Sequence, residues 1–173
     1  LPVEGGTPRQ ISFLKKNPSS AIWLDSENVL FSANLSDNSD FEPNNSEIYK
    51  LNIKSGKIDQ LTSRFGPDRS PIVSPDKTKI AFLGYDDKFL GYQQNSLYIM
   101  DVNGENVKLI SQGFDRNINN INWMKDGKGF YFQYDSEGMT RIASINLNGR
   151  VKDIVDELGG LSLGRPYSGG AYT

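Results

Sequence analysis

The 173-residue sequence predicts an all-β fold, and three observations support that class. A unit of roughly fifty residues occurs three times, and each unit holds four short apolar runs separated by polar turns. No stretch of useful length shows the apolar period of a helix. Gly, Asn and Asp stand in the turns, where the backbone needs positive φ. A fixed period with four strand-like segments per unit is typical of the blades of a β-propeller.

An aspartate in a turn marks each repeat. Asp25, Asp76 and Asp126 are 51 and 50 residues apart (76 − 25 and 126 − 76). An apolar run follows each turn, and a second apolar run, a polar turn and a final short run complete the unit. We therefore predict three complete four-stranded antiparallel blades, at about 18–62, 70–111 and 119–155.

Single strands of flanking blades are expected at both ends of the chain. Residues 7–13 have the pattern of the outer strand of a preceding blade, and residues 165–173 that of the inner strand of a following blade. The whole chain, 1–173, is then one domain, a partial β-propeller. Because propellers typically use about four to eight blades, three blades cannot close a ring. Exposed apolar faces are costly in water, so we expect a longer intact protein or self-association through the open blade faces.

Long connections are expected on one face of this propeller. The turns between the first and second strands, and between the third and fourth, are short. The connections between the second and third strands, at 36–46, 86–95 and 135–138, are long, and so are the connections between blades. In an antiparallel meander these two classes of long connection emerge on the same face. Irregular loops gathered on a rigid scaffold usually carry binding functions.

Composition narrows the classes of function. A net charge of −2 and a pI near 5.2 give no basic field for a phosphate backbone, so we expect no nucleic-acid partner. No apolar stretch is long enough to span a bilayer. Cysteine is absent, so there is no disulfide framework, and the compartment stays open between the cytoplasm and the bacterial periplasm or exterior.

The sequence contains no histidine. A Ser-His-Asp triad, a Cys-His pair or a histidine-bound metal cannot be assembled from it. Ser168 does not stand in the G-x-S-x-G pattern of a nucleophile, because Pro166 takes the place of the first Gly. We therefore expect no catalytic residue, no metal and no cofactor in this chain, and we assign Ser168 to a turn.

Two further patterns favour structural roles. A calcium site is the alternative to a solvated loop for four acidic residues, Asp37, Asp40, Glu42 and Glu47. Their spacing does not match a calcium-binding loop, so the solvated loop is favoured. Trp23 and Trp123 stand at equivalent places on inner strands, where core packing is favoured over ligand stacking.

Two aromatic–acidic pairs are candidates for contacts with a substrate or a partner domain. Tyr85 and Asp86 recur as Tyr134 and Asp135 at the ends of second strands, 49 residues later (134 − 85). A structural hydrogen bond at the blade edge is the alternative role for these residues.

An arginine stands in each connection between blades. Arg69, Arg116 and Arg165 are 47 and 49 residues apart (116 − 69 and 165 − 116), close to the repeat itself. Connections into inner strands border the central channel, so we expect three guanidiniums around one mouth. Guanidiniums bind carboxylates bidentately, so this rim would hold an acidic side chain or C-terminus of a peptide, or the catalytic domain. Asp68 and Asp115 directly precede two of these arginines, so inter-blade salt bridges are the alternative.

The middle repeat carries a motif that resembles a known family. Residues 74–82 read SPDKTKIAF and residues 97–104 read LYIMDVNG. They resemble the SPDG…IAF…LY repeat of TolB-type propellers and of the N-terminal propellers of prolyl oligopeptidase-family serine peptidases, with Lys77 in place of the Gly. The stretches similar to acylaminoacyl-peptidase-like or dipeptidyl-peptidase-like members are 65–71, 84–88, 113–116 and 159–170. The resemblance covers essentially the whole chain.

This resemblance implies a bacterial serine peptidase whose α/β-hydrolase domain lies C-terminal to the segment. In such enzymes the propeller caps the active site, excludes large folded substrates and helps to hold the peptide. The implied partners are therefore that hydrolase domain and a peptide substrate. None of the family's catalytic residues maps onto this sequence, since the triad belongs to the hydrolase domain.

Two other functions are weighed against the peptidase. The first is a TolB-like scaffold that binds another protein and has no enzymatic activity. A G-x-S-x-G pattern downstream in the reading frame would separate the peptidase from the scaffold. The second is a propeller lyase acting on sugar acids, which is weakened because such sites generally need histidine or metal ligands.

Overall fold

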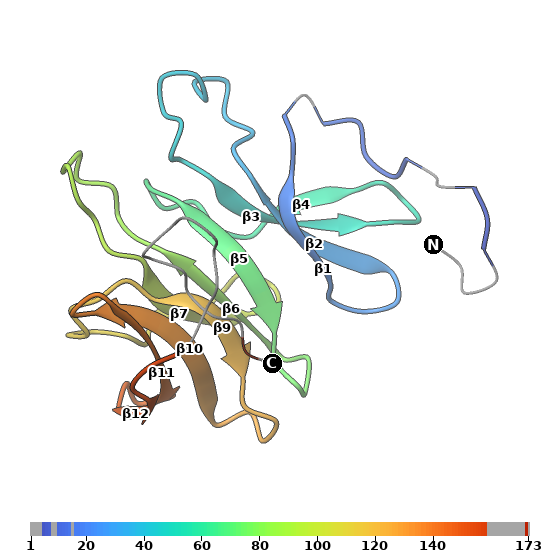
Figure 1. Cartoon of the computed structure of the whole chain (residues 1–173). Helices are drawn as coiled ribbons and strands as arrows, with labels where there is room; N and C mark the ends of the chain where they lie inside the picture. Colours follow the sequence, from blue (N-terminus) through green and yellow to red (C-terminus); the bar gives the residue numbers. More distant parts are fainter. Residues whose placement is uncertain (1–4, 8–9, 15, 159–171, 173) are drawn as a thin grey trace.

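The structure, a computed structural model, describes residues 5–7, 10–14, 16–158 and 172. These residues form twelve β-strands and no helix, so none of them belongs to a helix that could cross a membrane. The strands make three four-stranded sheets in which each pairing is antiparallel (Figure 1). The expected all-β, partial-propeller fold is confirmed.

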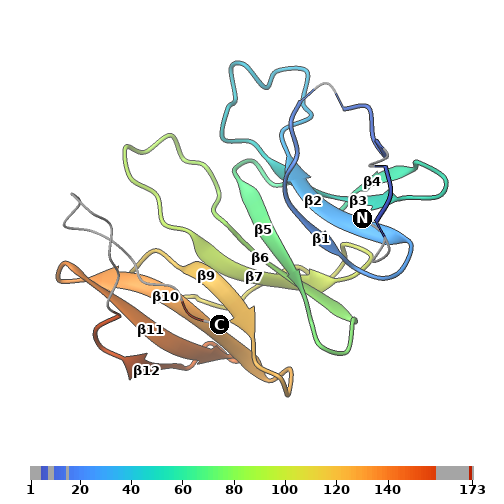
Figure 2. The same cartoon turned by 45° about the vertical axis from the view of Figure 1, so that its right-hand side comes forward.

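Each sheet is one blade of the propeller. Blade one consists of β1 (Ser19–Trp23), β2 (Asn28–Ala33), β3 (Glu47–Asn52) and β4 (Ile58–Gln60). Blade two consists of β5 (Asp68–Val73), β6 (Lys79–Gly84), β7 (Ser96–Asp101) and β8 (Lys108–Leu109). Blade three consists of β9 (Asn119–Trp123), β10 (Gly129–Ser136), β11 (Met139–Asn146) and β12 (Val151–Val155). The strands of a blade are paired in chain order, and β5 contacts both β1 and β9, so these three are the inner strands (Figure 2).

Two apolar layers fill the spaces between neighbouring blades. Along β6, Ile80 and Phe82 pack toward blade one, whereas Ala81 and Leu83 pack toward blade three. This alternation follows from the two-residue side-chain period of a strand. Because β6 is covered on both faces, its sequence is a continuous apolar run instead of an alternating one.

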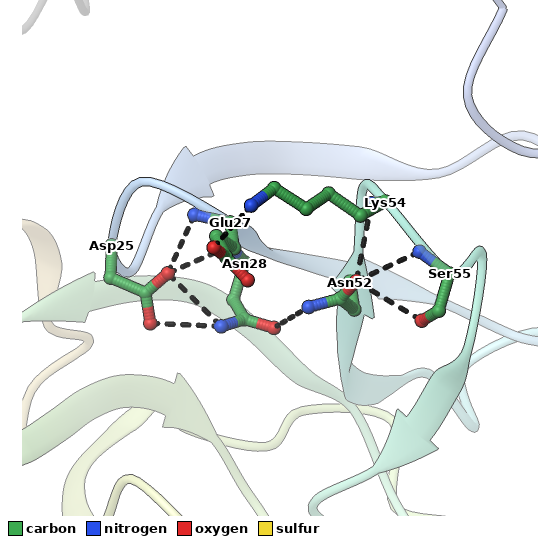
Figure 3. A network of polar contacts seen from close by, with 6 residues as sticks. All are labelled: Asp25, Glu27, Asn28, Asn52, Lys54 and Ser55. Atoms are coloured by element: carbon green, nitrogen blue, oxygen red, sulfur yellow. Dashed lines mark hydrogen bonds and ion pairs between the residues drawn. The ribbon is translucent and has the colours of Figure 1, made fainter.

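The aspartate that marks each repeat shapes the turn between the first and second strands. Asp25 Oδ1 accepts hydrogen bonds from the backbone N–H groups of Glu27 (2.8 Å) and Asn28 (2.9 Å) (Figure 3). Asp76 and Asp126 likewise accept from the backbone N–H two residues further on. Hydrogen bonds to the charged carboxylate, first that from the Glu27 amide, lower the pKa of Asp25. The repeated aspartate is therefore a turn-forming residue.

Asparagines link this turn of blade one to the turn between its third and fourth strands (Figure 3). Asn52 Nδ2 donates to Asn28 Oδ1 at 3.2 Å, and Asn52 Oδ1 accepts from Ser55 N at 2.9 Å. Lys54 Nζ pairs with Glu27 Oε1 at 2.5 Å. Both ion-pair partners are largely exposed, so the contact orients the two turns and adds little net stability.

The long connection expected at 135–138 is a tight hairpin. Strand β10 extends to Ser136 and β11 begins at Met139, which leaves only Glu137 and Gly138 between them. Their φ angles are 54° and 78°. Two central residues with positive φ give a turn whose twist matches that of the flanking strands, so the hairpin continues to its tip.

The N-terminal segment differs from the expected outer strand at 7–13. Residues 10–14 carry no strand. Leu14 instead packs against a buried group on blade one, the blade-one apolar cluster, which consists of Phe31, Ala33, Tyr49 and Leu51. An edge strand needs a neighbour to pair with, so burial of apolar surface decides the path of this segment. The inner strand expected at 165–173 lies outside the described residues, apart from Tyr172.

The two tryptophans differ in their surroundings. Trp123 is partly buried and packs in the layer between blades two and three, as expected. Trp23 is 61% exposed, so the expectation of core packing is wrong for this residue. Trp23 lies on the first blade and has no preceding blade among the described residues to pack against.

Candidate functional site on the loop face

The long connections gather on one face of the molecule, which we call the loop face. Connections 34–46 and 85–95, between second and third strands, project from the same side in both views (Figures 1 and 2). The connections between blades, 61–67 and 110–118, contact them there. Gly66 N donates to Asn45 Oδ1 (3.1 Å), and Asn95 N donates to Asn117 Oδ1 (2.8 Å). The loop face is thus cross-linked between neighbouring connections.

Arg64 lies at the centre of these contacts between blades one and two. Its Nη2 donates to Oδ1 of Asp68, whose side chain is fully buried at the start of β5. Its Nη1 pairs with Asp86 Oδ1 at 2.9 Å. The guanidinium carbon lies 3.9 Å from the ring centroid of Tyr98 on β7, a cation–π contact. The Arg64 side chain thus links the connection 61–67 to β5, to the loop 85–95 and to β7.

Glycines make room for this arrangement. A Cβ on Gly84 would lie 2.2 Å from the carbonyl oxygen of Pro67 and 2.5 Å from Asp68 Oδ1. A Cβ on Gly66, which has a φ of 142°, would lie 2.0 Å from the carbonyl oxygen of Tyr85. The end of β6 and the connection 61–67 approach so closely that only glycine fits.

A buried carboxyl lies beside the Arg64 contacts. Thr62 Oγ1 donates to Glu47 Oε2 at 2.5 Å and accepts from the backbone N–H of Ile48 at 2.9 Å. Glu47 is 7% exposed. Burial raises the pKa of Glu47 to about 7, and nearby Asp68 adds to this, while the Thr62 hydrogen bond and Arg64 oppose it.

The contact between blades two and three has no counterpart of Arg64 or Glu47. Ser111 Oγ accepts from the backbone N–H of Leu97, as Thr62 does from Ile48, but the strand β7 begins with Ser96 where β3 begins with Glu47. In the connection 110–118, Phe114 packs edge-on against Phe132 and Tyr134, with ring centroids 5.3 and 5.2 Å away. The contact between blades two and three is therefore aromatic where that between blades one and two is ionic.

The loop 85–95 presents exposed apolar side chains on a well-defined backbone. Asp87 Oδ1 accepts from Phe89 N (2.8 Å) and from Gln93 Nε2 (2.6 Å). Phe89 has a φ of 55°, which is uncommon for a bulky residue. Phe89, Leu90 and Tyr92 are 82%, 61% and 65% exposed. Exposed aromatic groups on a hydrogen-bonded loop are suited to contact a partner or peptide.

Two pockets flank this loop. The first has a volume of about 430 Å³ and contains Tyr85, Asp86, Tyr98 and Asp115 in its lining. The second has a volume of about 490 Å³ and is lined by Asn44, Asp87 and the tip of the loop. Tyrosines, amides and carboxylates around an apolar loop offer both apolar contact and hydrogen bonds to an extended peptide.

The structure separates the two candidate aromatic–acidic pairs. Tyr85 and Asp86 follow β6 and line the first pocket, where Asp86 already pairs with Arg64. Tyr134 and Asp135 lie within β10. The Tyr134 hydroxyl donates to Asp153 Oδ1 and Asp135 Oδ1 accepts from the Thr140 hydroxyl, both at 2.7 Å. The first hydrogen bond reaches from β10 across β11 to β12, and the second joins the neighbouring strands β10 and β11. The ligand role of the four residues stays a prediction.

The arginines of the expected rim have local partners. Arg69 is on β5, and its Nη2 donates to Asn95 Oδ1 at 2.7 Å. Arg116 pairs with the adjacent Asp115 at 3.3 Å, and both side chains are largely exposed. Arg165 lies outside the described residues. No inter-blade salt bridge to Arg69 or Arg116 is found among the described residues, and the peptide-binding role of the rim stays a prediction.

The acidic loop 36–47 does not assemble a metal site in the described part of the chain. Asp40 Oδ1 pairs with Lys16 Nζ at 2.9 Å, and Glu42 Oε2 accepts from Asn45 Nδ2 at 3.2 Å. Glu47 faces Thr62. Within the described residues, no group of three or more His, Cys, Asp or Glu side chains is placed to hold a metal ion.

Sequence reasoning missed Arg64, Thr62 and Glu47 as members of one network. These residue types do not recur at the repeat distance, where Ser96, Ser111 and Gly113 stand instead. A signal was present in the stretch 62–68, which carries Arg64 and Asp68 four residues apart in a connection that must pass between two blades.

The fold and its loop face define an open, partial β-propeller. No family model matches the chain. Over 114 residues, 64% of this chain, it is 31% identical to dipeptidyl-peptidase 5 of Porphyromonas gingivalis. The match spans 16% of the length of that protein, so this chain corresponds to a small part of it.

Solved structures agree with the fold. The putative TolB from Agrobacterium tumefaciens superimposes with a TM-score of 0.67 at 22% identity, over 88% of this chain and 54% of the other. The β-propeller domain of the Trilobed protease from Pyrococcus furiosus gives 0.56 at 23% identity, over 79% and 39%. The expected resemblance to TolB-type and peptidase propellers is confirmed. The chain is a propeller segment that shares its fold with both.

Proposed function

We propose that this chain is the non-catalytic, substrate-gating propeller segment of a bacterial serine peptidase of the prolyl oligopeptidase kind. The observation that carries the proposal is the 31% identity to dipeptidyl-peptidase 5 over 114 residues, 64% of this chain. A propeller without histidine cannot supply the triad, so hydrolysis belongs to an α/β-hydrolase domain elsewhere in the parent protein.

The loop face is the part of this segment that would gate the peptide. It carries the exposed apolar loop 85–95, two flanking pockets and the exposed Arg116. A cross-linked set of loops excludes a folded protein by bulk, while an extended peptide fits between loops. The hydrolase domain is the partner that we place against this face.

A TolB-like scaffold without enzymatic activity is the second candidate. The observation that favours it is the TM-score of 0.67 with the putative TolB, higher than that with the Trilobed protease propeller. In that case the same loop face would bind a protein partner, and no G-x-S-x-G pattern would follow in the gene.

Activity measurements separate these candidates. We expect the intact gene product to release dipeptides from chromogenic substrates and to react with a fluorophosphonate probe. The 173-residue chain should do neither, because the nucleophile and its base lie outside it. An unlabelled, inactive gene product would contradict the peptidase. Labelling of the 173-residue chain at any serine, Ser168 included, would contradict its non-catalytic role.

An arginine variant tests the contact with peptide. In the intact enzyme, Arg116→Ala should lower kcat/KM about tenfold for peptides with an acidic side chain or a free C-terminus, because it removes a charge-assisted hydrogen bond. Peptides that are neutral at those positions should be unaffected. The control is Arg150→Ala, an exposed arginine in a short turn on the opposite face. Equal kinetics for the two variants would show that Arg116 does not contact substrate.

A further inference from the structure

A pocket lies between blades two and three at the end of the strands opposite to the loop face. The turns that border it, 74–78 and 124–128, join the first and second strands of these blades (Figure 2). Its lining includes Ile99, Trp123 and Leu147, which are partly buried and pack against the apolar layer between the two blades. Its volume of about 480 Å³ falls within the range of about 300–1,000 Å³ that is typical of pockets for small ligands. The pocket thus combines an apolar floor with the size of a small-molecule site.

The indole of Trp123 is held in place at this pocket by contacts with both blades. Its Nε1 donates to the carbonyl oxygen of Ile72 on β5 at 3.4 Å, and its ring lies against that of Phe130 on β10, with centroids 4.0 Å apart. Ile99 on β7 and Leu147, which follows β11, add aliphatic surface beside the indole. An aromatic ring that is already fixed loses little conformational entropy when a second ring packs on it. The apolar part of the pocket therefore favours a ligand with an aromatic ring.

The two carboxylates in the lining of this pocket already have hydrogen-bond donors within their own turns. Asp76 accepts from the hydroxyl groups of Ser74 (2.6 Å) and Thr78 (2.9 Å), and also from the backbone N–H of Thr78 (3.1 Å). Asp126 accepts from the backbone N–H of Lys128 at 3.0 Å. Asp76 and Asp126 therefore shape the turns around the pocket, and neither needs a cationic ligand as its partner.

The lysines of the pocket differ from the carboxylates in this respect. Lys79 and Lys125 belong to the lining, and Lys79 is paired with Asp101. Lys125 is exposed and forms no ion pair with any residue that the structure describes. A third ammonium group lies next to the apolar wall, because Lys108 Nζ donates to the carbonyl oxygen of Leu147 at 3.2 Å. The charge without an ion-pair partner at this pocket is therefore positive, and it is complementary to an anion.

We propose that this pocket binds a small aromatic carboxylate, with its ring against Trp123 and its carboxylate on Lys125 Nζ. The ammonium–carboxylate hydrogen bond is charge-assisted, and contact between the ring and the indole buries apolar surface. An aromatic amine of the same shape would place its ammonium group beside that of Lys125, where like charges repel each other. The site lies at the opposite end of the blades from the loop face, so it does not depend on the proposed peptidase function.

Tryptophan fluorescence tests binding at this pocket. In Trp23→Phe, Trp123 is the single tryptophan, and Trp23 is 61% exposed, so its replacement disturbs no core packing. The 173-residue Trp23→Phe chain is titrated with 3-phenylpropionate and, in parallel, with 3-phenylpropylamine, which has the same ring and the opposite charge. We expect a saturable change in Trp123 emission with the carboxylate and no saturable change with the amine.

A lysine variant tests the position of the carboxylate. In the Trp23→Phe chain, Lys125→Gln should raise the Kd for 3-phenylpropionate about tenfold, because it removes a hydrogen bond to a charged group. The matched control is Lys152→Gln, an exposed lysine outside the lining, which should leave the Kd unchanged.

Three results would overturn the proposal. Emission that does not saturate with 3-phenylpropionate would show that the pocket does not bind an aromatic carboxylate. Equal affinity for the amine would show that the pocket does not select an anion, and equal Kd values for the two lysine variants would show that Lys125 does not hold the carboxylate. None of these readouts uses peptidase activity, so failure of the proposed function would leave them unchanged.

Discussion

Replacing Arg64 by alanine should destabilise the chain by about 3–5 kcal/mol, because it leaves the carboxylate of Asp68 buried without a partner. Asp68 is fully buried, and Arg64 is the cation that pairs with it among the described residues. The variant also loses the cation–π contact with Tyr98, and Asp86 loses its ion pair. Urea unfolding followed by circular dichroism measures the change in the free energy of unfolding.

Two further variants separate this cause from a general loss of side-chain contacts. Arg116→Ala removes an arginine whose ion-pair partner, Asp115, is exposed, and it should change stability by less than about 0.5 kcal/mol. The double variant Arg64→Ala/Asp68→Asn removes the unpaired charge and should recover part of the loss. A double variant less stable than Arg64→Ala alone would show that the buried charge is not the cause.

The fold could be predicted from the sequence because its determinants are local and repeat. Aspartate-led turns and four apolar runs per unit place the strands without knowledge of their neighbours. The hairpin at Glu137 and Gly138 was harder to predict, since a polar stretch is compatible both with a loop and with a paired strand end. The path of Leu14 depends on an apolar face of blade one that exists only after folding. Residue patterns do not encode which surface such a segment will cover.

The candidate site was predicted only in part for a related reason. Tyr85 and Asp86 were found because they recur, and they do line a pocket on the loop face. Arg64 was missed because its partners come from three different strands and loops, and only the approach of β6 to the connection 61–67, allowed by Gly84, brings them together. Sequence distance gives no measure of such contacts.

The stability of the chain should fall as pH rises from about 4.5 to 8, and Glu47→Gln should remove much of this fall. The pKa of Glu47 is raised from 4.5 to about 7 in the folded chain, mainly by burial. The folded state therefore binds a proton more tightly than the unfolded state, and this contribution is complete below pH 4.5 and lost as pH rises through 7. At about 1.4 kcal/mol per pKa unit, the full difference between 4.5 and about 7 amounts to roughly 3–4 kcal/mol.

Glutamine tests this contribution because its amide is neutral at every pH and its oxygen can still accept the hydrogen bond from Thr62. We expect Glu47→Gln to equal the parent chain near pH 4.5 and to exceed it by roughly 3 kcal/mol in the free energy of unfolding at pH 8. Asp68 and Arg64 face Glu47 and are present in both proteins, so only the part of their titration that is coupled to the Glu47 charge enters the difference. Glu105→Gln, at an exposed turn, is the matched control and should follow the parent chain throughout. A difference between Glu47→Gln and the parent chain that stays constant from pH 4.5 to 8 would show that Glu47 titrates alike in the folded and unfolded states, and the buried carboxyl between blades one and two would then carry no pH dependence.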